Sequence, residues 1–212
     1  QEVRVRFSLR PPEIMNLDNL NNLIELFSLQ ADTQNKKDIF LEWLNPLNKK
    51  TYTWEETQNN ILKLSKIIRE NIKEDDRCLL VSENRPEWFI SDIAIMLSGG
   101  ITVPAYTTYT EDDYKYLIED CEPSLVIVSN NEMLKKLNNT INEKKFIKKV
   151  ITLDEVNKVT NSLKIINKNK YLDFNTILKN NLLEEDKIQN NKLKRTSPAC
   201  IIYTSGIGGN PK

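Results

Sequence analysis

The sequence contains no histidine, only 5 glycines and only 3 cysteines. Without histidine there can be no Ser-His-Asp triad, no Cys-His pair and no histidine-ligated metal in this segment. The cysteines Cys78, Cys121 and Cys200 lie far apart, and their odd, unpatterned count predicts reduced thiols in a cytosolic setting. Any chemistry here must therefore use phosphate positioning, carboxylates, hydroxyls or lysine.

An excess of charge and long apolar runs are also absent. The 30 basic and 30 acidic side chains cancel, so no overall field favours nucleic acid or an anionic membrane. No apolar run reaches about 18 residues, and there is no cleavable signal pattern. The basic stretch 192–195 lacks interleaved aromatics, which argues against a nucleic-acid patch. We expect a soluble, cytoplasmic protein without a nucleic-acid partner; peripheral association with a membrane stays open.

The scarce glycines are concentrated at the end of the chain, with three of the five in 206–212. They follow the apolar, β-branched stretch 199–203, which predicts a buried strand. A strand that enters a hydroxyl-rich, glycine-rich loop suits an anion such as phosphate, because backbone N–H groups can converge on its oxygens. Thr204 and Ser205 can donate hydrogen bonds, and Lys212 can balance charge. The alternative is a plain glycine turn between two elements.

Two other phosphate loops are excluded by one residue. A Walker A loop needs glycine directly before its lysine, but Pro211 occupies that place and has no N–H to donate. The dinucleotide fingerprint GxGxxG fails as well, because Pro211 stands where its third glycine belongs.

The string 203–212 instead resembles the phosphate loop of the adenylate-forming enzymes, Y-T-S-G-[ST]-T-G-x-P-K. Acyl-CoA synthetases, luciferases and peptide-synthetase adenylation domains share this loop. Seven residues match the pattern: Tyr203, Thr204, Ser205, Gly206, Gly209, Pro211 and Lys212. Ile207 departs from it where the family has Ser or Thr, and Gly208 departs where the family usually has Thr.

The resemblance extends upstream, over roughly residues 16–212. The segments 82–88 (SENRPEW) and 99–106 (GGITVPAY) are similar to the early core of long-chain fatty acyl-CoA synthetases, and 51–56 (TYTWEE) is similar to the segment before the family's first long helix. The stretch 103–110 most resembles bacterial long-chain enzymes.

The rest of the chain alternates between strand and helix patterns. Apolar spacing predicts helices at 17–30, 54–68, 86–97, 110 onward, 132–137 and 172–178, and strands at 77–82, 101–103, 125–128 and 147–153, with a hairpin over 39–44 and 50–53. Such alternation predicts an α/β fold with a parallel sheet and helices on both faces.

Three segments divide the chain. Residues 1–14 contain arginine but neither lysine nor asparagine, and we expect translated upstream sequence or an unstructured extension. Residues 15–212 are expected to form an incomplete N-terminal AMP-binding domain, as a fragment of a longer protein. Within it, the Asn- and Lys-rich stretch 154–197 is expected to be a partly mobile surface excursion.

Two polar clusters invite a functional interpretation. The carboxylates at 111–113 could pass for a metal site, but Thr110 and Asp113 fit a capping box, so we expect a helix start and no metal. The triplet 83–85 follows a predicted strand, where open α/β sheets place ligand loops. A cluster that only stabilises the loop is the alternative there.

The resemblance implies an enzyme that activates a long-chain fatty acid with Mg·ATP, through acyl-AMP, and transfers the acyl group to coenzyme A. Its partners would be these small molecules. The resemblance assigns binding of the ATP phosphates to Thr204, Ser205, Gly206, Ile207, Gly208, Gly209 and Lys212. No complete catalytic set is expected within the chain, which alone should be inactive. An aryl-acid or luciferase-like ligase and a non-catalytic remnant remain alternatives.

Overall fold

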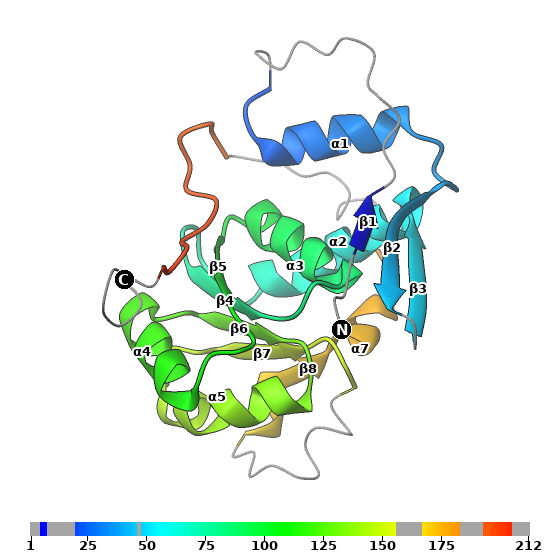
Figure 1. Ribbon diagram of the computed structural model, residues 1–212. Helices are drawn as coiled ribbons and strands as arrows, with labels where there is room; N and C mark the ends of the chain where they lie inside the picture. The colour runs from blue at the N-terminus through cyan, green and yellow to red at the C-terminus, as the bar shows by residue number, and fades with distance from the viewer. Residues whose placement is uncertain (1–4, 8–19, 46–47, 156–166, 183–192, 205–212) are drawn as a thin grey trace.

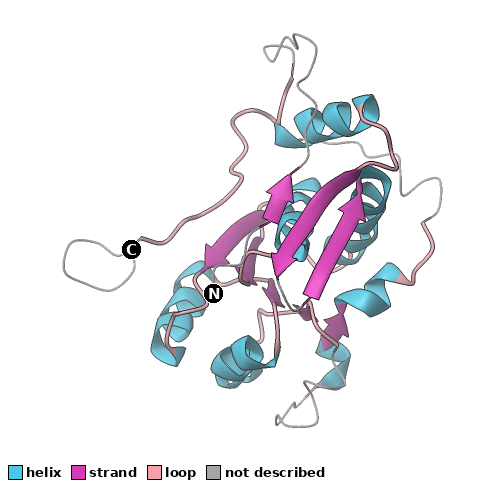
Figure 2. Cartoon of the chain, turned by 45° about the vertical axis from the view of Figure 1, so that its right-hand side comes forward, coloured by secondary structure: helices cyan, strands magenta, loops and turns pink. Residues whose placement is uncertain are grey.

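The computed structural model describes residues 5–7, 20–45, 48–155, 167–182 and 193–204. Two sheets organise them: an antiparallel sheet of order β1-β2-β3 and a parallel sheet of order β5-β4-β6-β7-β8 (Figures 1 and 2). The strands are β1 (Val5–Phe7), β2 (Ile39–Asn45), β3 (Asn48–Thr53), β4 (Arg77–Val81), β5 (Ile101–Ala105), β6 (Leu125–Val128), β7 (Lys149–Thr152) and β8 (Tyr171–Asp173). The helices are α1 (Leu23–Thr33), α2 (Trp54–Arg69), α3 (Pro86–Leu97), α4 (Glu111–Cys121), α5 (Asn131–Glu143), the 3₁₀ turn η2 (Lys168–Lys170) and α7 (Phe174–Leu178).

The parallel sheet is buried on both faces, which explains why β6 is apolar at every position and β4 at every position after Arg77. Leu80 and Ile127 face a core built with α1, α2, α3 and α7, whereas Leu79 and Val126 face a second core built with α4 and α5. Figure 1 shows the two helical layers on opposite sides of the sheet. The predicted α/β fold with helices on both faces is confirmed.

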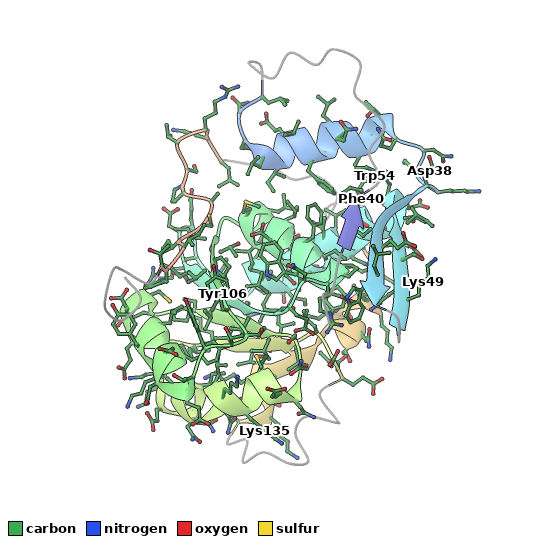
Figure 3. The ribbon with its side chains drawn as sticks, in the orientation of Figure 1. Asp38, Phe40, Lys49, Trp54, Tyr106 and Lys135 are labelled. Carbon is green, nitrogen blue, oxygen red and sulfur yellow. The ribbon has the colours of Figure 1, made fainter. Side chains whose placement is uncertain are left out.

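The small antiparallel sheet packs against the start of α2. The ring of Phe40, on β2, stacks on Trp54 with centroids 3.8 Å apart and planes 22° from parallel. Both residues are labelled in Figure 3. Thr53 begins α2 with a capping box to Glu56, whose carboxylate accepts from the Thr53 N–H. The predicted hairpin is therefore confirmed, and it is held in place by aromatic packing.

The capping box predicted at Thr110 is present. The Thr110 hydroxyl accepts from the Asp113 N–H at 3.2 Å, and Asp113 accepts from the Thr110 N–H at 2.9 Å. The helix-start interpretation of 111–113 is thus confirmed. Among the described residues no group of three or more His, Cys, Asp or Glu could hold a metal. Within the same ranges, no helix has the length and apolar character needed to cross a bilayer.

The predictions for residues 1–14 and 172–178 need correction. Val5–Phe7 are not unstructured, since they form β1 and pair with the outer edge of β2 (Phe7 opposite Leu41); the remainder of 1–14 lies outside the described residues. The helix predicted over 172–178 starts only at Phe174, because Asp173 is its N-cap and accepts from the Thr176 N–H at 2.7 Å. Tyr171–Asp173 are instead β8, the edge of the parallel sheet, so part of the polar stretch 154–197 belongs to the sheet.

The predicted strand 199–203 is reduced to one bridge beside β5. Thr102 donates its N–H to the Ala199 carbonyl at 3.1 Å, and its own carbonyl accepts from the Ile201 N–H at 2.9 Å. The pairing is parallel, as expected, but Cys200, Ile201 and Ile202 are exposed because no described element covers them. The prediction of a buried strand is therefore wrong for these three residues.

Hydrogen bonds also join the segment 193–195 to the start of α1. The Asn22 side chain donates to the Leu193 carbonyl at 2.9 Å, and Arg195 Nε donates to the Leu20 carbonyl at 2.7 Å. Residues from opposite ends of the described chain therefore lie side by side.

Candidate functional site

The order in which strands are added to the parallel sheet reverses at β4. The chain leaves β4 through α3 to β5 on one side, then passes through α4 to β6 on the other side. In open parallel sheets, ligands bind outside the carboxyl ends of the strands at such a switch point. A ligand site is therefore expected where β4 and β5 end.

A cleft of about 420 Å³ lies there, within the range of small-molecule sites. Its walls come from the turn after β4, the first turn of α3, the end of β5 with the following loop, and the segment beside β5. The lining residues are Ser82, Glu83, Asn84, Trp88, Pro104, Ala105, Tyr106, Thr107, Ile202 and Tyr203. The cleft is thus mostly apolar and aromatic, with polar groups concentrated on the β4 side.

The loop after β5 is anchored by its own backbone. The Tyr114 hydroxyl donates to the Tyr106 carbonyl at 2.6 Å, and Lys136 Nζ donates to the Thr107 carbonyl at 3.1 Å. Burial, with the nearby Tyr109 hydroxyl, raises the pKa of Tyr114, so its hydroxyl stays protonated and remains a donor. The Tyr106 ring itself is 66% exposed (labelled in Figure 3), and it meets Tyr109 edge to face with centroids 5.5 Å apart. This wall therefore has a fixed backbone and an accessible aromatic ring.

Tyr203 anchors the segment that enters the predicted phosphate loop. Its side chain is only 7% exposed, and its hydroxyl donates to Asp120 at the end of α4. Burial and the Asp120 carboxylate both raise the pKa of Tyr203, which keeps the donor proton in place. The next residue, Thr204, is exposed. The loop thus departs from a fixed point at the rim of the cleft.

The triplet 83–85 divides into two roles. Glu83 and Asn84 line the cleft. The Arg85 guanidinium lies instead over the ring of Trp43 and donates to Glu87 at 2.8 Å and to Asp154 at 3.1 Å. Arg85 therefore stabilises the loop, which was the alternative interpretation of this triplet. Glu83 and Asn84 contribute to the wall of the cleft.

Glu87 is a residue that sequence reasoning missed. It is fully buried in the first turn of α3 and accepts hydrogen bonds from Lys50, Tyr52 and Arg85. Burial alone raises the pKa of Glu87, but the hydrogen bond and charge of Arg85, together with Lys50, outweigh burial and lower the pKa to about 2. A glutamate in the first turn of a nearly all-apolar helix was the available signal. Its partners Lys50 and Tyr52 on β3 are 37 and 35 residues away in the sequence, so no local residue pattern could identify them.

Of the predicted phosphate-binding residues, the structure places only Thr204. Ser205, Gly206, Ile207, Gly208, Gly209 and Lys212 lie outside the described residues. Phosphate binding by this loop therefore stays a prediction, supported by the position of Tyr203, which lines the cleft directly before the exposed Thr204.

Comparison with known proteins adds relatives. Long chain acyl-CoA synthetase 3 of Arabidopsis thaliana is 31% identical over 165 residues, which are 76% of this chain and 24% of that protein. The human long-chain-fatty-acid–CoA ligase ACSBG1 is 26% identical over 148 residues, 68% of this chain and 20% of that protein. The chain thus spans about a quarter of the length of the curated relatives it matches.

Solved structures share the fold. The luciferase-like enzyme from the mealworm Zophobas morio superposes with a TM-score of 0.66 at 16% identity, over 99% of this chain and 45% of that chain. The anthranilate CoA ligase AuaEII, in complex with anthranoyl-AMP, gives a TM-score of 0.57 at 19% identity, over 78% of this chain and 29% of that chain. At these identities the likeness concerns the fold alone.

A sequence model of a protein family matches most of this chain. The model described as "AMP-binding enzyme" matches residues 27–212, which include the whole parallel sheet and the cleft. Taken with the shared fold, this match shows that the chain belongs to the AMP-binding enzymes, the adenylate-forming ligases.

Proposed function

We propose that the full-length protein, of which this chain would be the N-terminal portion, is a long-chain fatty acid–CoA ligase. The observation that carries the proposal is the position of Tyr203, which lines the mostly apolar cleft and is followed by the exposed Thr204 at the start of the predicted phosphate loop. The names of the curated relatives support a long-chain acyl substrate.

The reaction would proceed in two displacements. A carboxylate oxygen of the fatty acid attacks the α-phosphorus of ATP, and the bond to pyrophosphate breaks. The coenzyme A thiolate then attacks the acyl carbonyl, and AMP leaves. Neither step needs an oxidant or a reductant, so catalysis depends on holding the reactants in line and stabilising the charge of the leaving pyrophosphate.

The role assigned to this chain is binding of the β- and γ-phosphates of ATP. Thr204 and Ser205 would donate hydroxyl hydrogen bonds, backbone N–H groups of 206–209 would converge on oxygens, and Lys212 would balance charge. Magnesium would arrive with ATP, held through the phosphate oxygens, which is its usual mode in such sites.

Pyrophosphate exchange into ATP tests the proposal. The full-length protein would be incubated with Mg·ATP, labelled pyrophosphate and one carboxylic acid at a time: palmitate, a short aliphatic acid, or an aryl acid such as anthranilate. Exchange that depends on palmitate is expected. Exchange only with the aryl acid would favour the aryl-acid alternative, and no exchange with any acid would favour a non-catalytic protein. Cell fractionation would test the cytoplasmic location that forms part of this proposal.

A further inference from the structure

The buried carboxylate of Glu87 connects β3 to the start of α3. One of its oxygens accepts from Lys50 and from the Tyr52 hydroxyl (2.9 Å), both on β3, and the other accepts from Arg85 Nε at 2.8 Å. No part of the Glu87 side chain is exposed. Since a buried charge is tolerated only when its partners have good geometry, the cluster fixes these groups relative to one another.

This cluster stands directly behind the cleft wall. Glu87 lies between Arg85, which is the N-cap residue of α3, and Trp88, which lines the cleft. The Arg85 side chain makes no cap hydrogen bond to its own helix, so its guanidinium serves the carboxylates instead. The turn 82–84 is therefore followed by Arg85, whose side chain is held by Glu87 and Asp154, and neither of these carboxylates lines the cleft.

Arg85 is shared among three carboxylates at increasing distance. Its nitrogens lie 2.8 Å from Glu87, 3.1 Å from Asp154 and 3.8 Å from Glu83. Two cations, Lys50 and Arg85, thus face three anions, and Glu83, the anion that lines the cleft, has the longest contact. The orientation of the guanidinium set by Glu87 therefore decides how strongly Glu83 is drawn away from the cleft.

We propose that Glu87 and Arg85 are positioning residues, which hold the turn 82–84 and Trp88 in the arrangement that the cleft needs for turnover. The turnover part of this inference rests on the proposed function. Removing the Glu87 charge would leave a buried guanidinium with only the two outer carboxylates, so the guanidinium and Glu83 would move toward each other and the wall would shift.

The test compares Glu87→Gln with Leu64→Ala in the full-length protein. Leu64 is fully buried on α2 and does not line the cleft, so its variant loses stability without touching the wall. Steady-state turnover would be measured with Mg·ATP and palmitate, well below the melting temperature of both variants. We expect Glu87→Gln to lower kcat by about 10- to 100-fold, and Leu64→Ala to change it less than about twofold. Equal kcat and KM values for Glu87→Gln and the unmodified protein would overturn the inference.

A second measurement does not depend on activity. Amide hydrogen exchange in peptides that span 82–88 should rise in Glu87→Gln and stay unchanged in Leu64→Ala, relative to peptides from α5. A rise spread evenly over the chain would show a merely structural role and overturn the inference. An unmodified protein that is inactive with every acid would refute the proposed function alone, and the exchange pattern would still decide the positioning role.

Two further variants cover the case in which Glu87→Gln does not fold. Arg85→Lys keeps the charge but loses the planar fork that reaches several carboxylates, so it should lower kcat and raise exchange at 82–88. Tyr52→Phe removes one hydrogen bond and leaves both ion pairs, so it should change kcat far less. Arg85→Lys with unaltered turnover and unaltered exchange would overturn the inference.

Discussion

The Tyr203 hydroxyl donates its hydrogen bond to the Asp120 carboxylate and so ties the segment beside β5 to the last turn of α4. The residues before and after Tyr203, Ile202 and Thr204, are exposed, whereas Tyr203 is buried. This single side chain therefore sets where the predicted phosphate loop begins.

Tyr203→Phe should lower the free energy of unfolding by about 1 kcal/mol, because it removes the buried donor of a partly buried hydrogen bond to Asp120. Denaturant titration of the 212-residue chain measures the effect. Tyr116→Phe is the matched control: Tyr116 lies on the same helix and is 37% exposed, and its change should stay within about 0.5 kcal/mol. Equal effects of the two variants would show that the Asp120 contact does not stabilise the fold.

Glu87 should make stability depend on acid pH. Its pKa is lowered from 4.5 to about 2, so its contribution is complete above pH 4.5 and is lost as the pH falls toward 2. Glu87→Gln should therefore flatten the decline of unfolding free energy below about pH 4.5. Glu74→Gln, at an exposed position, should leave the dependence of unfolding free energy on pH unchanged. An unchanged slope in Glu87→Gln would mean that its carboxylate titrates alike in the folded and unfolded chain.

Gly99 ends α3 with a left-handed backbone, φ +80°. Gly99→Ala should therefore destabilise the fold by about 1–2 kcal/mol, whereas Gly99→Asn should cost less because asparagine tolerates this region better. No described atom would come closer than 3.8 Å to an added Cβ, so a steric clash does not confuse the comparison. Melting temperatures of the two variants check the order, and alanine at least as stable as asparagine would contradict it.

Ile207→Thr should raise acyl-adenylate formation in the full-length protein, since it would restore the hydroxyl that the family's loop carries at that position. One donor to a developing charge is worth a factor of about 10² to 10³. Palmitate-dependent pyrophosphate exchange measures it. Identical rates would indicate that position 207 does not face phosphate.

Lys212→Ala should weaken the response to Mg·ATP far more than the affinity for the fatty acid. The reason is that the ammonium group is assigned to the phosphates and not to the acyl chain. Separate titrations of ATP and palmitate give the two KM values. A defect confined to palmitate would remove Lys212 from the phosphate site.

Local patterns predicted much of the fold, because the deciding information lies within a few neighbouring residues. The strand Leu125–Val128 and the capping box at Thr110 follow directly from apolar runs and side-chain chemistry. The strand β8 was not predicted because three residues in a polar stretch carry no alternation, and their pairing with the distant strand β7 cannot be read from local sequence. The cluster of Glu87 and Lys50 was not predicted either, since 37 residues separate the two and no spacing rule connects them.

The contacts of Asn22 with Leu193 and of Arg195 with Leu20 join residues 171 and 175 positions apart. Closing so long a stretch of chain costs conformational entropy. The cost is smaller once the intervening strands have paired, because the chain that remains to be closed is then shorter. During synthesis the amino end emerges first, so α1 must wait for nearly the whole described chain before these bonds can form. These two bonds are therefore late contacts, whereas Phe27 of α1 can pack on Phe40 and Trp54 as soon as β2 and α2 have formed.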